Sequence, residues 1–200
     1  FHLAATPHVQ YSIENPTDNN NLDSLINILD LSRIIEAKRF VFSSSSAVYG
    51  NPTYTPIDEN HPLNPLSPYA LHKLVGEQYC KLYSNLYNLD TVCLRYFNAY
   101  GNRMPNKGAY RSVISIFMEQ TEKNQLLNIV NDGEQKRDFV HVEDIVQANI
   151  LCAKSKNNLN GEIFNVGTGE AFTVNEIANM FGGEKKYGEL RVEPKDSVAE

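Results

Sequence analysis

The alternation of predicted strands and helices constrains the fold of this chain more than any other feature. Apolar runs at 1–5, 38–44 and 90–98 have the length of buried strands, and helical apolar periods at 22–37 and 68–87 separate them. Strands with continuous apolar runs that alternate with helices are typical of a parallel sheet covered by helices. We therefore expect an α/β fold built on a doubly wound parallel sheet.

The second helical period carries a clear start signal. Ser67 is a suitable N-cap, and Pro68 follows at the first helical position, where proline is favoured. The proline-rich stretch before it, 50–68, cannot form regular structure. We expect the helix to end near Tyr87. The residues expected on its buried face are Leu71, Leu74, Val75, Tyr79, Leu82 and Leu86.

The pattern changes after about Gly101, where a loop at 102–110 is followed by shorter elements. The helices expected beyond this loop are 111–122, 143–154 and 174–181, and the expected strands are 127–130, 138–141 and 162–169 with its turn. Thr173 and Glu176 have the spacing of a capping box at the start of the last helix.

Charge and composition argue against several classes of function. A net charge of −6 without a Lys/Arg cluster argues against a nucleic-acid surface, and no apolar run is long enough to span a membrane. Cys80, Cys93 and Cys152 are widely spaced and show no disulfide or metal pattern, so we expect a cytoplasmic protein without a metal site. Because the chain opens at Phe1 inside a strand pattern, we also expect a fragment.

Tyr69 and Lys73 are the first candidate site residues. They lie four residues apart in the first turns of a predicted helix, so both side chains leave the same face. A nearby ammonium favours the phenolate form of a tyrosine. Bringing a tyrosine pKa from ~10 to near neutrality requires about 4 kcal/mol. The other interpretation is a surface Tyr/Lys pair, since this spacing is common by chance.

A run of serines, "SSSSAVYG" (43–50), directly follows the apolar core of the strand at 38–44. The carboxyl ends of parallel strands are where ligands bind in open α/β folds, so Ser45 could share a substrate hydroxyl with Tyr69. The other interpretation is a serine-rich turn that satisfies its own backbone. We favour a functional role because the Tyr/Lys pair follows at a compatible distance.

Six segments, in this order and spacing, resemble the extended short-chain dehydrogenase/reductases, and within them the nucleotide-sugar 4-epimerases. The segments are "FHLAA", "FVFSSSSAVYG", "PLSPYALHK", "LRYFNAYG", "NDGEQKRDFVHVEDIVQA" and "FNVGTG". The resemblance implies a partial Rossmann-type sheet with a smaller α/β substrate lobe. By that resemblance, 1–101 and about 138–166 belong to the NAD-binding domain, and about 102–137 and 167–200 to the substrate lobe.

The resemblance implies a catalytic set of Ser45, Tyr69 and Lys73 and a tightly bound NAD. In such enzymes the tyrosine takes the proton of the sugar C4 hydroxyl while hydride passes from C4 to the nicotinamide. The 4-keto sugar turns over, and hydride returns to its other face. Ser45 would hydrogen-bond the reacting oxygen, and Lys73 would hold the nicotinamide ribose and lower the pKa of Tyr69.

Further roles are implied position by position. The residues implied to line the cofactor are Ala4, Ala5, Asn21, Ser43, Tyr69, Lys73 and Tyr96. The residues implied to contact a UDP-sugar substrate are Ser44, Ser45, Asn98, Arg137 and Ser197. Asn98 and Arg137 would contact the diphosphate, since a guanidinium fork suits phosphate oxygens. For Arg137, a surface ion pair with Asp138 is the other interpretation.

Ala47 bears on the choice among related reactions. Related 4,6-dehydratases and decarboxylases carry an acidic residue at this position, and because epimerisation needs none, the alanine favours a 4-epimerase. Another NAD-dependent nucleotide-sugar dehydratase and a UDP-glucuronate 4-epimerase stay open as alternatives. So does a truncated, cofactor-free sugar-nucleotide binder, because the 200 residues lack the family's G-x-x-G-x-x-G turn for the cofactor pyrophosphate.

Two segments resemble parts of the family that select the sugar. "EPKDSVAE" (193–200) resembles the segment with a gate residue beside the sugar 2-position, which places Ser197 as a small gate that leaves room for an N-acetyl group. "NKGAYRSVI" (106–114) resembles the loop of epimerases for N-acetylated sugars. We therefore expect UDP-N-acetylglucosamine/UDP-N-acetylgalactosamine as substrates, with UDP-glucose/UDP-galactose also accepted.

The resemblance also bears on assembly. It implies a homodimer through helices 22–37 and 66–87. We expect the 200 residues alone to be inactive.

Overall fold

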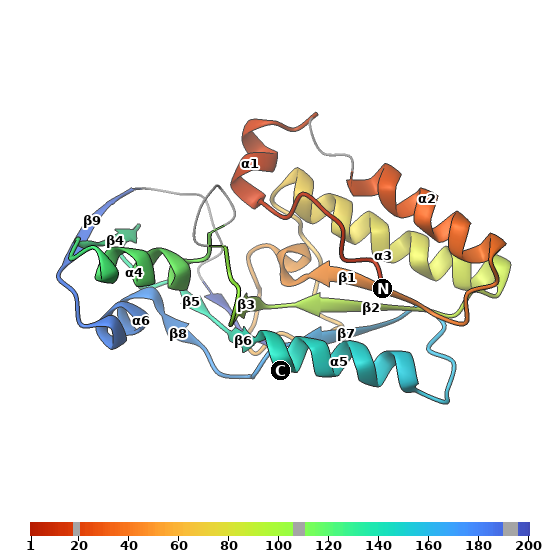
Figure 1. Cartoon of the computed structure of the whole chain (residues 1–200). Coiled ribbons are helices and arrows are strands. Elements are labelled where there is room, and N and C mark those ends of the chain that lie inside the picture. Colours follow the sequence, from red (N-terminus) through yellow and green to blue (C-terminus); the bar gives the residue numbers. More distant parts are fainter. Residues whose placement is uncertain (18–20, 106–110, 190–195) are drawn as a thin grey trace.

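A three-stranded parallel sheet forms the centre of the molecule. The structure is a computed structural model that describes residues 1–17, 21–105, 111–189 and 196–200. Strands β1 (Phe40–Ser45), β2 (Thr91–Tyr96) and β7 (Glu162–Val166) lie in the order β1-β2-β7, and both pairs are parallel (Figure 1). The α/β fold with a parallel sheet that the sequence predicts is therefore confirmed.

The strand expected at residues 1–5 is reduced to a single bridge. His2 pairs in parallel with Phe42 on the outer side of β1. The main chain of His2 donates to the Val41 carbonyl at 2.9 Å and accepts from the Ser43 N–H at 3.2 Å. Phe1 and Leu3 on either side of it are exposed.

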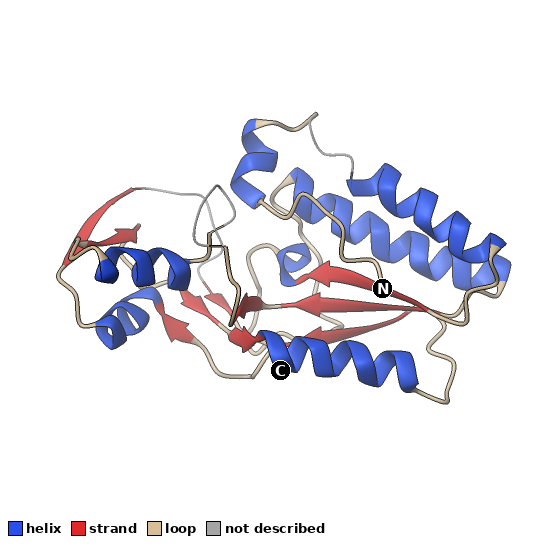
Figure 2. Cartoon of the chain, in the orientation of Figure 1, coloured by secondary structure: helices blue, strands red, loops and turns tan. Residues whose placement is uncertain are grey.

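Helices cover both faces of this sheet. Helices α2 (Asn21–Ile34) and α3 (Pro68–Tyr87) lie on one face, and α5 (Val142–Lys154) lies on the other (Figures 1 and 2). Because successive strand residues point to opposite faces, the sheet contributes to two separate cores. The core shared with α2 and α3 contains Leu25, Leu29, Phe40, Phe42, Cys80 and Cys93. The core on the α5 side contains Val41, Val92, Leu94, Ile145 and Val166.

Helix α3 begins and ends where the sequence predicts, but it turns a different face to the core. The Ser67 hydroxyl caps it by accepting from the Ala70 N–H at 3.1 Å. Leu71, Leu82 and Leu86, expected to be buried, are 48%, 46% and 63% exposed. The buried positions are instead Tyr69, Ala70, Lys73, Gly76, Glu77, Cys80, Tyr83 and Ser84. Tyr69, Lys73 and Glu77 have hydrogen-bonding partners in β1 and β2, which no apolar pattern within the helix can reveal.

A second group of elements packs around its own small core. Helices α4 (Val113–Glu122) and α6 (Val174–Phe181) pack with strands β4 (Leu127–Val130) and β9 (Lys185–Glu189). The remaining short strands are β3 (Asn98–Tyr100) with β6 (Phe139–His141), and β10 (Asp196–Ser197), β5 (Lys136–Arg137) and β8 (Phe172–Thr173) in one sheet. The capping box of Thr173 and Glu176 is present as predicted.

Two short helical segments were not predicted from the sequence. Helix α1 (Val9–Glu14) follows the N-terminal bridge, and a 3₁₀ turn at Ser46–Tyr49 follows β1. Both are too short to show a helical apolar period. Across the described parts of the chain, none of the helices combines the length and apolarity that crossing a bilayer requires. Residues 106–110 of the "NKGAYRSVI" segment and 193–195 of "EPKDSVAE" lie outside the described residues.

Candidate active site

A cavity of about 290 Å³ opens at the carboxyl ends of β1 and β2. Six residues that the sequence predicts as site residues line it together: Ser45, Tyr69, Tyr96, Asn98, Arg137 and Ser197. Three apolar side chains in and just before helix α1, those of Pro7, Val9 and Ile13, are among the other residues of the wall. The cavity lies where ligands bind in open α/β folds, so these residues form a candidate active site.

The hydroxyls of the serine run have partners from different elements. Ser45 shares a hydrogen bond with the Tyr69 hydroxyl and also accepts from the Ala47 N–H at 3.2 Å. The Ser43 hydroxyl lies 3.2 Å from the Tyr96 hydroxyl. Ser44 points to the other face of the strand, where it donates to the buried Glu77 carboxylate at 2.5 Å. Ser44 is therefore withdrawn as a substrate contact, because its hydroxyl lies in the core.

Tyr69 and Lys73 are both buried, which shapes their acid–base chemistry. Burial raises the pKa of Tyr69, and the hydrogen bond with Ser45 acts in the opposite direction. The ammonium of Lys73 lies 5.7 Å from the centre of the Tyr69 ring. The two side chains thus lie close together, but the pKa of Tyr69 is raised in this structure. From the sequence we expect a lowered pKa for Tyr69 in a site that also holds NAD.

The Lys73 ammonium retains unused hydrogen-bonding capacity. It donates to the Ser43 carbonyl at 2.6 Å, and burial lowers its pKa to about 8. An ammonium has three N–H donors, and within the described parts of the chain the Ser43 carbonyl is its hydrogen-bond partner. A buried ammonium with unused N–H donors near the carboxyl end of β1 could bind a polar ligand such as the ribose of a nicotinamide nucleotide.

The Tyr96 hydroxyl belongs to a polar network beside this lysine. It accepts from the Asn149 side-chain N–H at 2.8 Å and contacts Ser43. Asn149 also donates to the Ile145 carbonyl at 2.7 Å, which fixes the orientation of its amide. Sequence reasoning missed Asn149, because its place opposite Tyr96 depends on the packing of α5 against the sheet.

The predicted cofactor residues near the N-terminus lie apart from this cavity. Asn21 holds the chain at Thr6, since its side chain accepts from the Thr6 N–H at 2.7 Å and donates to the Thr6 carbonyl at 3.2 Å. Ala4 is exposed and Ala5 is half-buried in the same segment. The structure therefore gives Asn21 a structural role, and all three remain predictions as cofactor contacts.

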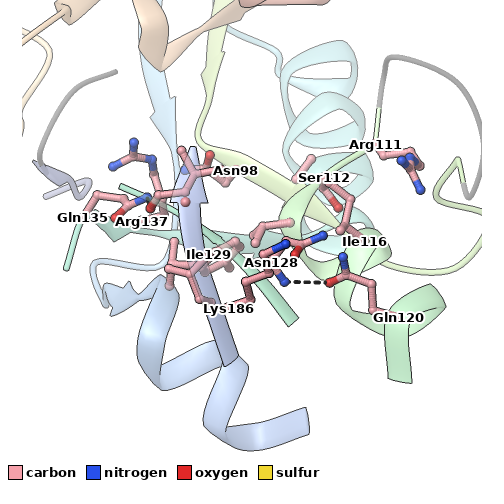
Figure 3. A pocket seen from close by; sticks show the side chains of 16 residues that line it. Asn98, Arg111, Ser112, Ile116, Gln120, Asn128, Ile129, Gln135, Arg137 and Lys186 are labelled. Carbon is pink, nitrogen blue, oxygen red and sulfur yellow. Dashed lines mark hydrogen bonds between the residues drawn. The ribbon is translucent and has the colours of Figure 1, made fainter. Parts of the chain in front are cut away.

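A larger cavity of about 720 Å³ adjoins the first (Figure 3). Asn98 and Arg137 line both cavities, so the two cavities meet at these residues, and we call them together the cleft. The polar residues that Figure 3 labels in the larger cavity include Arg111, Ser112, Gln120, Asn128, Gln135 and Lys186. Sequence reasoning missed this set because its members come from several short elements and share no local motif.

Arg137 and Asp138 have separate environments. Arg137 is buried, and its guanidinium donates to the Lys136 carbonyl at 2.8 Å. The Asp138 carboxylate accepts from the backbone N–H groups of Thr168, Gly169 and Ala199 at 2.9 to 3.2 Å. A surface ion pair with Asp138 therefore does not describe this arrangement, because both side chains are buried. Asp138 instead holds the 168–169 turn beside the segment that carries Ser197, which pairs with Arg137 in β10–β5.

Comparison with known proteins shows where these features recur. A family profile described as "NAD dependent epimerase/dehydratase family" matches residues 1–167. Over 200 residues the chain is 46% identical to a Methanocaldococcus jannaschii protein provisionally named UDP-glucose 4-epimerase, which covers 96% of this chain and 64% of the relative. The UDP-glucose 4-epimerase of Mycolicibacterium smegmatis is 35% identical over 190 residues, covering 92% of this chain and 58% of the relative.

Solved structures give the same result for the whole described fold. The UDP-N-acetylglucosamine 4-epimerase of Methanobrevibacter ruminantium, in complex with UDP-N-acetylmuramic acid, superposes with a TM-score of 0.92 at 36% identity, covering 100% of this chain and 66% of that one. The UDP-glucose 4-epimerase of Thermotoga maritima with UDP-glucose has a TM-score of 0.94 at 33% identity, covering 100% and 67%. The chain thus spans about two thirds or less of its relatives' length, and it belongs to the NAD dependent epimerase/dehydratase family.

Proposed function

We propose that the protein interconverts the C4 epimers of UDP-hexoses through a 4-keto intermediate, with tightly bound NAD as cofactor. The observation that carries this proposal is the meeting of Ser45 and Tyr69 at one cavity, with Ala47 in its wall and the Lys73 ammonium behind them, 5.7 Å from the centre of the Tyr69 ring. An acid at position 47 would lie beside the substrate and could serve an elimination. An alanine there leaves a proton acceptor and a hydroxyl donor, which epimerisation needs.

The residues around Lys73 fit the nicotinamide end of NAD. Lys73 has spare donors, and Ser43 and Tyr96 place two hydroxyls beside it. Ala4, Ala5 and Asn21 are proposed to extend this surface along the cofactor. When bound, NAD supplies a hydride acceptor and donor at the sugar C4.

The chain's own residues would handle the proton and the orientation of the sugar. Tyr69 takes the proton from the C4 hydroxyl, and Ser45, already bonded to Tyr69, donates to the same oxygen. Because burial raises the pKa of Tyr69, the phenolate depends on positive charge close to it. The Lys73 ammonium supplies one such charge.

The two adjoining cavities suggest how the substrate would lie. The hexose would occupy the smaller cavity with Ser45 and Tyr69, and the diphosphate would reach Asn98 and Arg137, where the two cavities join. The uridine would then occupy the larger cavity. A guanidinium at the junction suits two phosphates, because it can donate to two oxygens in one plane.

Ser197 lines the hexose cavity and supports a preference among the sugars. Its small side chain leaves room beside the sugar, so we propose UDP-N-acetylglucosamine/UDP-N-acetylgalactosamine as substrates, with UDP-glucose/UDP-galactose also accepted. The decisive experiment incubates the full-length protein with each UDP-sugar and identifies the products. C4 epimers support the proposal. A 4-keto-6-deoxy sugar as product would indicate a dehydratase. Epimerisation of UDP-glucuronate and of no other UDP-sugar would indicate a UDP-glucuronate 4-epimerase. Binding without turnover would indicate a cofactor-free binder.

We also propose a division into two parts and a homodimer. Residues 1–101 and about 138–166 would form the NAD-binding domain, and about 102–137 and 167–200 the substrate lobe. The dimer would form through helices 22–37 and 66–87, which expose a set of large apolar side chains: Ile28, Leu31, Ile34, Ile35, Leu71, Leu82, Leu86 and Tyr87. If so, Leu31→Glu with Leu86→Glu should convert a dimer to a monomer in sedimentation, whereas Leu151→Glu on α5 should not. A cytoplasmic location remains a prediction that rests on the cysteine content.

A further inference from the structure

Helix α3 carries a buried carboxylate that the proposed reaction does not use. Glu77 lies four residues after Lys73 and eight after Tyr69, so all three side chains leave the same face of the helix. The Glu77 carboxylate accepts from the Ser44 hydroxyl at 2.5 Å and from the Arg95 Nε and Nη2 groups at 2.8 and 2.7 Å. We call Ser44, Glu77 and Arg95 the Glu77 cluster; none of its members is more than 3% exposed.

The cluster joins α3 to β1 and β2 at positions that are paired with each other in the sheet. Ser44 and Arg95 are directly paired in the β1–β2 ladder. On either side of Ser44 along β1 lie the two contacts that the candidate site depends on. The Ser43 carbonyl accepts from Lys73, and Ser45 bonds to Tyr69. The Glu77 cluster therefore lies between the two places on β1 where α3 contacts the strand, Lys73 at Ser43 and Tyr69 at Ser45.

Such a cluster of buried charges is expected to add little to the free energy of unfolding. Burying two charges costs nearly as much as their attraction returns, and apolar side chains of similar volume are often equally stable there. What an ion pair adds over apolar contact is direction, because a guanidinium that donates two bonds to one carboxylate permits a single arrangement. Arg95 extends that arrangement to the cavity, since its Nη1 donates to the hydroxyl of Tyr49, a wall residue, at 2.8 Å.

We propose that the Glu77 cluster is a positioning device that sets the height and rotation of α3, so that Tyr69 meets Ser45 while Lys73 meets the Ser43 carbonyl. The proposal rests on the proposed epimerase function, in which Tyr69 and Ser45 touch the reacting oxygen. Glu77, Arg95 and Ser44 act only through them. Catalytic groups displaced by a fraction of an ångström lose rate, and a displacement of about 1 Å can cost about 10²-fold.

The test replaces the ion pair by apolar side chains of similar length in the NAD-loaded full-length protein. Glu77→Met with Arg95→Met removes both charges of the pair together, so neither is left without the other, and kcat for the UDP-hexose is expected to fall about 10- to 100-fold with little change in KM. A second variant, Ser44→Ala, keeps the ion pair and removes only its bond to β1. It should show a smaller fall of the same kind.

A spectroscopic readout follows Tyr69 without turnover. The ultraviolet signal of the Tyr69 phenolate is the difference between each variant and the same variant carrying Tyr69→Phe. The hydrogen bond from Ser45 favours the phenolate, so losing the alignment should move the Tyr69 titration to higher pH. This readout also separates the two proposals. A wild-type protein inactive on every UDP-hexose refutes the proposed function, while the titration still decides the role of the cluster.

The matched control is the ion pair of Arg39 and Asp90, which precede β1 and β2 at the opposite end of the same strands. Arg39→Met with Asp90→Asn should lower stability but leave kcat and the Tyr69 titration unchanged. A folded Glu77→Met/Arg95→Met variant with wild-type kcat and titration would overturn the proposal. If that variant does not fold, Ser44→Ala decides by the same two measurements.

Discussion

At the residue scale, Lys73 is a buried charge whose lost hydration lowers the stability of the fold. Its ammonium is buried between Phe42 and the Tyr69 ring, with Nζ 4.9 and 5.7 Å from the ring centres. Contacts with ring faces and one carbonyl return only part of the hydration that burial removes. The lysine therefore destabilises the isolated fold for as long as it is protonated, which is expected of a residue kept for function.

This cost should appear as a pH dependence of stability. The pKa of Lys73 is about 8 in the folded chain against 10.5 for an ordinary lysine. Below pH 8 both states are protonated and the cost is complete. Between about pH 8 and 10.5 the unfolded chain binds more protons, so the cost disappears as pH rises. The wild-type chain should gain about 3 kcal/mol relative to Lys73→Met over this interval, an order-of-magnitude figure. Urea unfolding of both proteins at pH 7 and pH 10 measures it, and a constant difference would contradict the assignment.

The proposed role of Tyr69 gives the clearest activity prediction. Tyr69→Phe removes the proton acceptor and almost no volume, so kcat on the UDP-hexose should fall at least about 10²-fold in the full-length protein. Tyr54→Phe, at an exposed turn outside the cavity, is the matched control and should leave kcat unchanged. A fall smaller than about tenfold would remove Tyr69 from the role of base.

Ser197 provides a test of the substrate. A tyrosine at this position would fill part of the hexose cavity, and overpacking costs about 1–3 kcal/mol or more. Ser197→Tyr should therefore reduce kcat/KM for the N-acetylated pair selectively and spare UDP-glucose/UDP-galactose. Both pairs are assayed with the same enzyme preparation. Equal effects on the two pairs would show that Ser197 does not lie beside the sugar 2-position.

The serine run shows what a sequence can and cannot predict at this scale. The strand end and the distance to Tyr69 can be read from the sequence, and they favoured a Ser45 that shares a substrate hydroxyl with Tyr69; in the structure both residues line one cavity. The role of Ser44 was not predictable in the same way. It depends on Glu77, which lies 33 positions away in the sequence on another element, and no apolar period indicates that a glutamate in a helix points into the core.

At the scale of the element, helix α3 combines predictable bounds with an unpredictable face. The Ser67 cap and Pro68 define its start, and both follow from local chemistry. Its orientation depends on how closely it approaches α2 and β1. Gly76 permits that approach, because a Cβ atom added there would lie 2.7 Å from Leu25 Cδ2 and 2.8 Å from Phe42 Cζ. The close approach keeps the polar side chains at 69, 73 and 77 within reach of the strands.

Gly76→Ala should therefore destabilise the protein, although alanine is the better helix former by roughly 1 kcal/mol. Overpacking costs typically about 1–3 kcal/mol in a core, so the net result is a lower Tm. Gly188→Ala is the control, since nothing lies within 4 Å of its added Cβ. Thermal unfolding of both variants measures the effect. A Tm for Gly76→Ala at or above wild type would mean that α3 does not pack as closely as described.

At the scale of the whole molecule, the cleft joins the two groups of elements. Strands β1 and β2 supply Ser45 and Tyr96, helix α3 supplies Tyr69, and the smaller group supplies most of the wall of the larger cavity. Asp138 holds the two together, because it lies between β5 and β6 and binds the turn after β7. The sequence predicted the sheet from its apolar runs. The smaller group was harder, because its strands of two to five residues pair across long separations.

The 200 residues expressed alone should bind the two ligands of the proposed enzyme, UDP and NAD, with unequal affinity. These residues contain no G-x-x-G-x-x-G sequence, the turn whose N–H groups bind a dinucleotide pyrophosphate. Each hydrogen bond to a charged group is worth about 1.5–3 kcal/mol, so losing two weakens binding by roughly 10²- to 10⁴-fold. The proposed UDP site, in contrast, lies within the chain at Asn98, Arg137 and the larger cavity. Calorimetry should therefore detect UDP binding, abolished by Arg137→Met, but no comparable binding of NAD, and no epimerase turnover should occur. Circular dichroism serves to confirm that the tested chain is folded. NAD that copurifies with the 200 residues, or UDP that binds equally well after Arg137→Met, would place the ligands elsewhere than in this cleft.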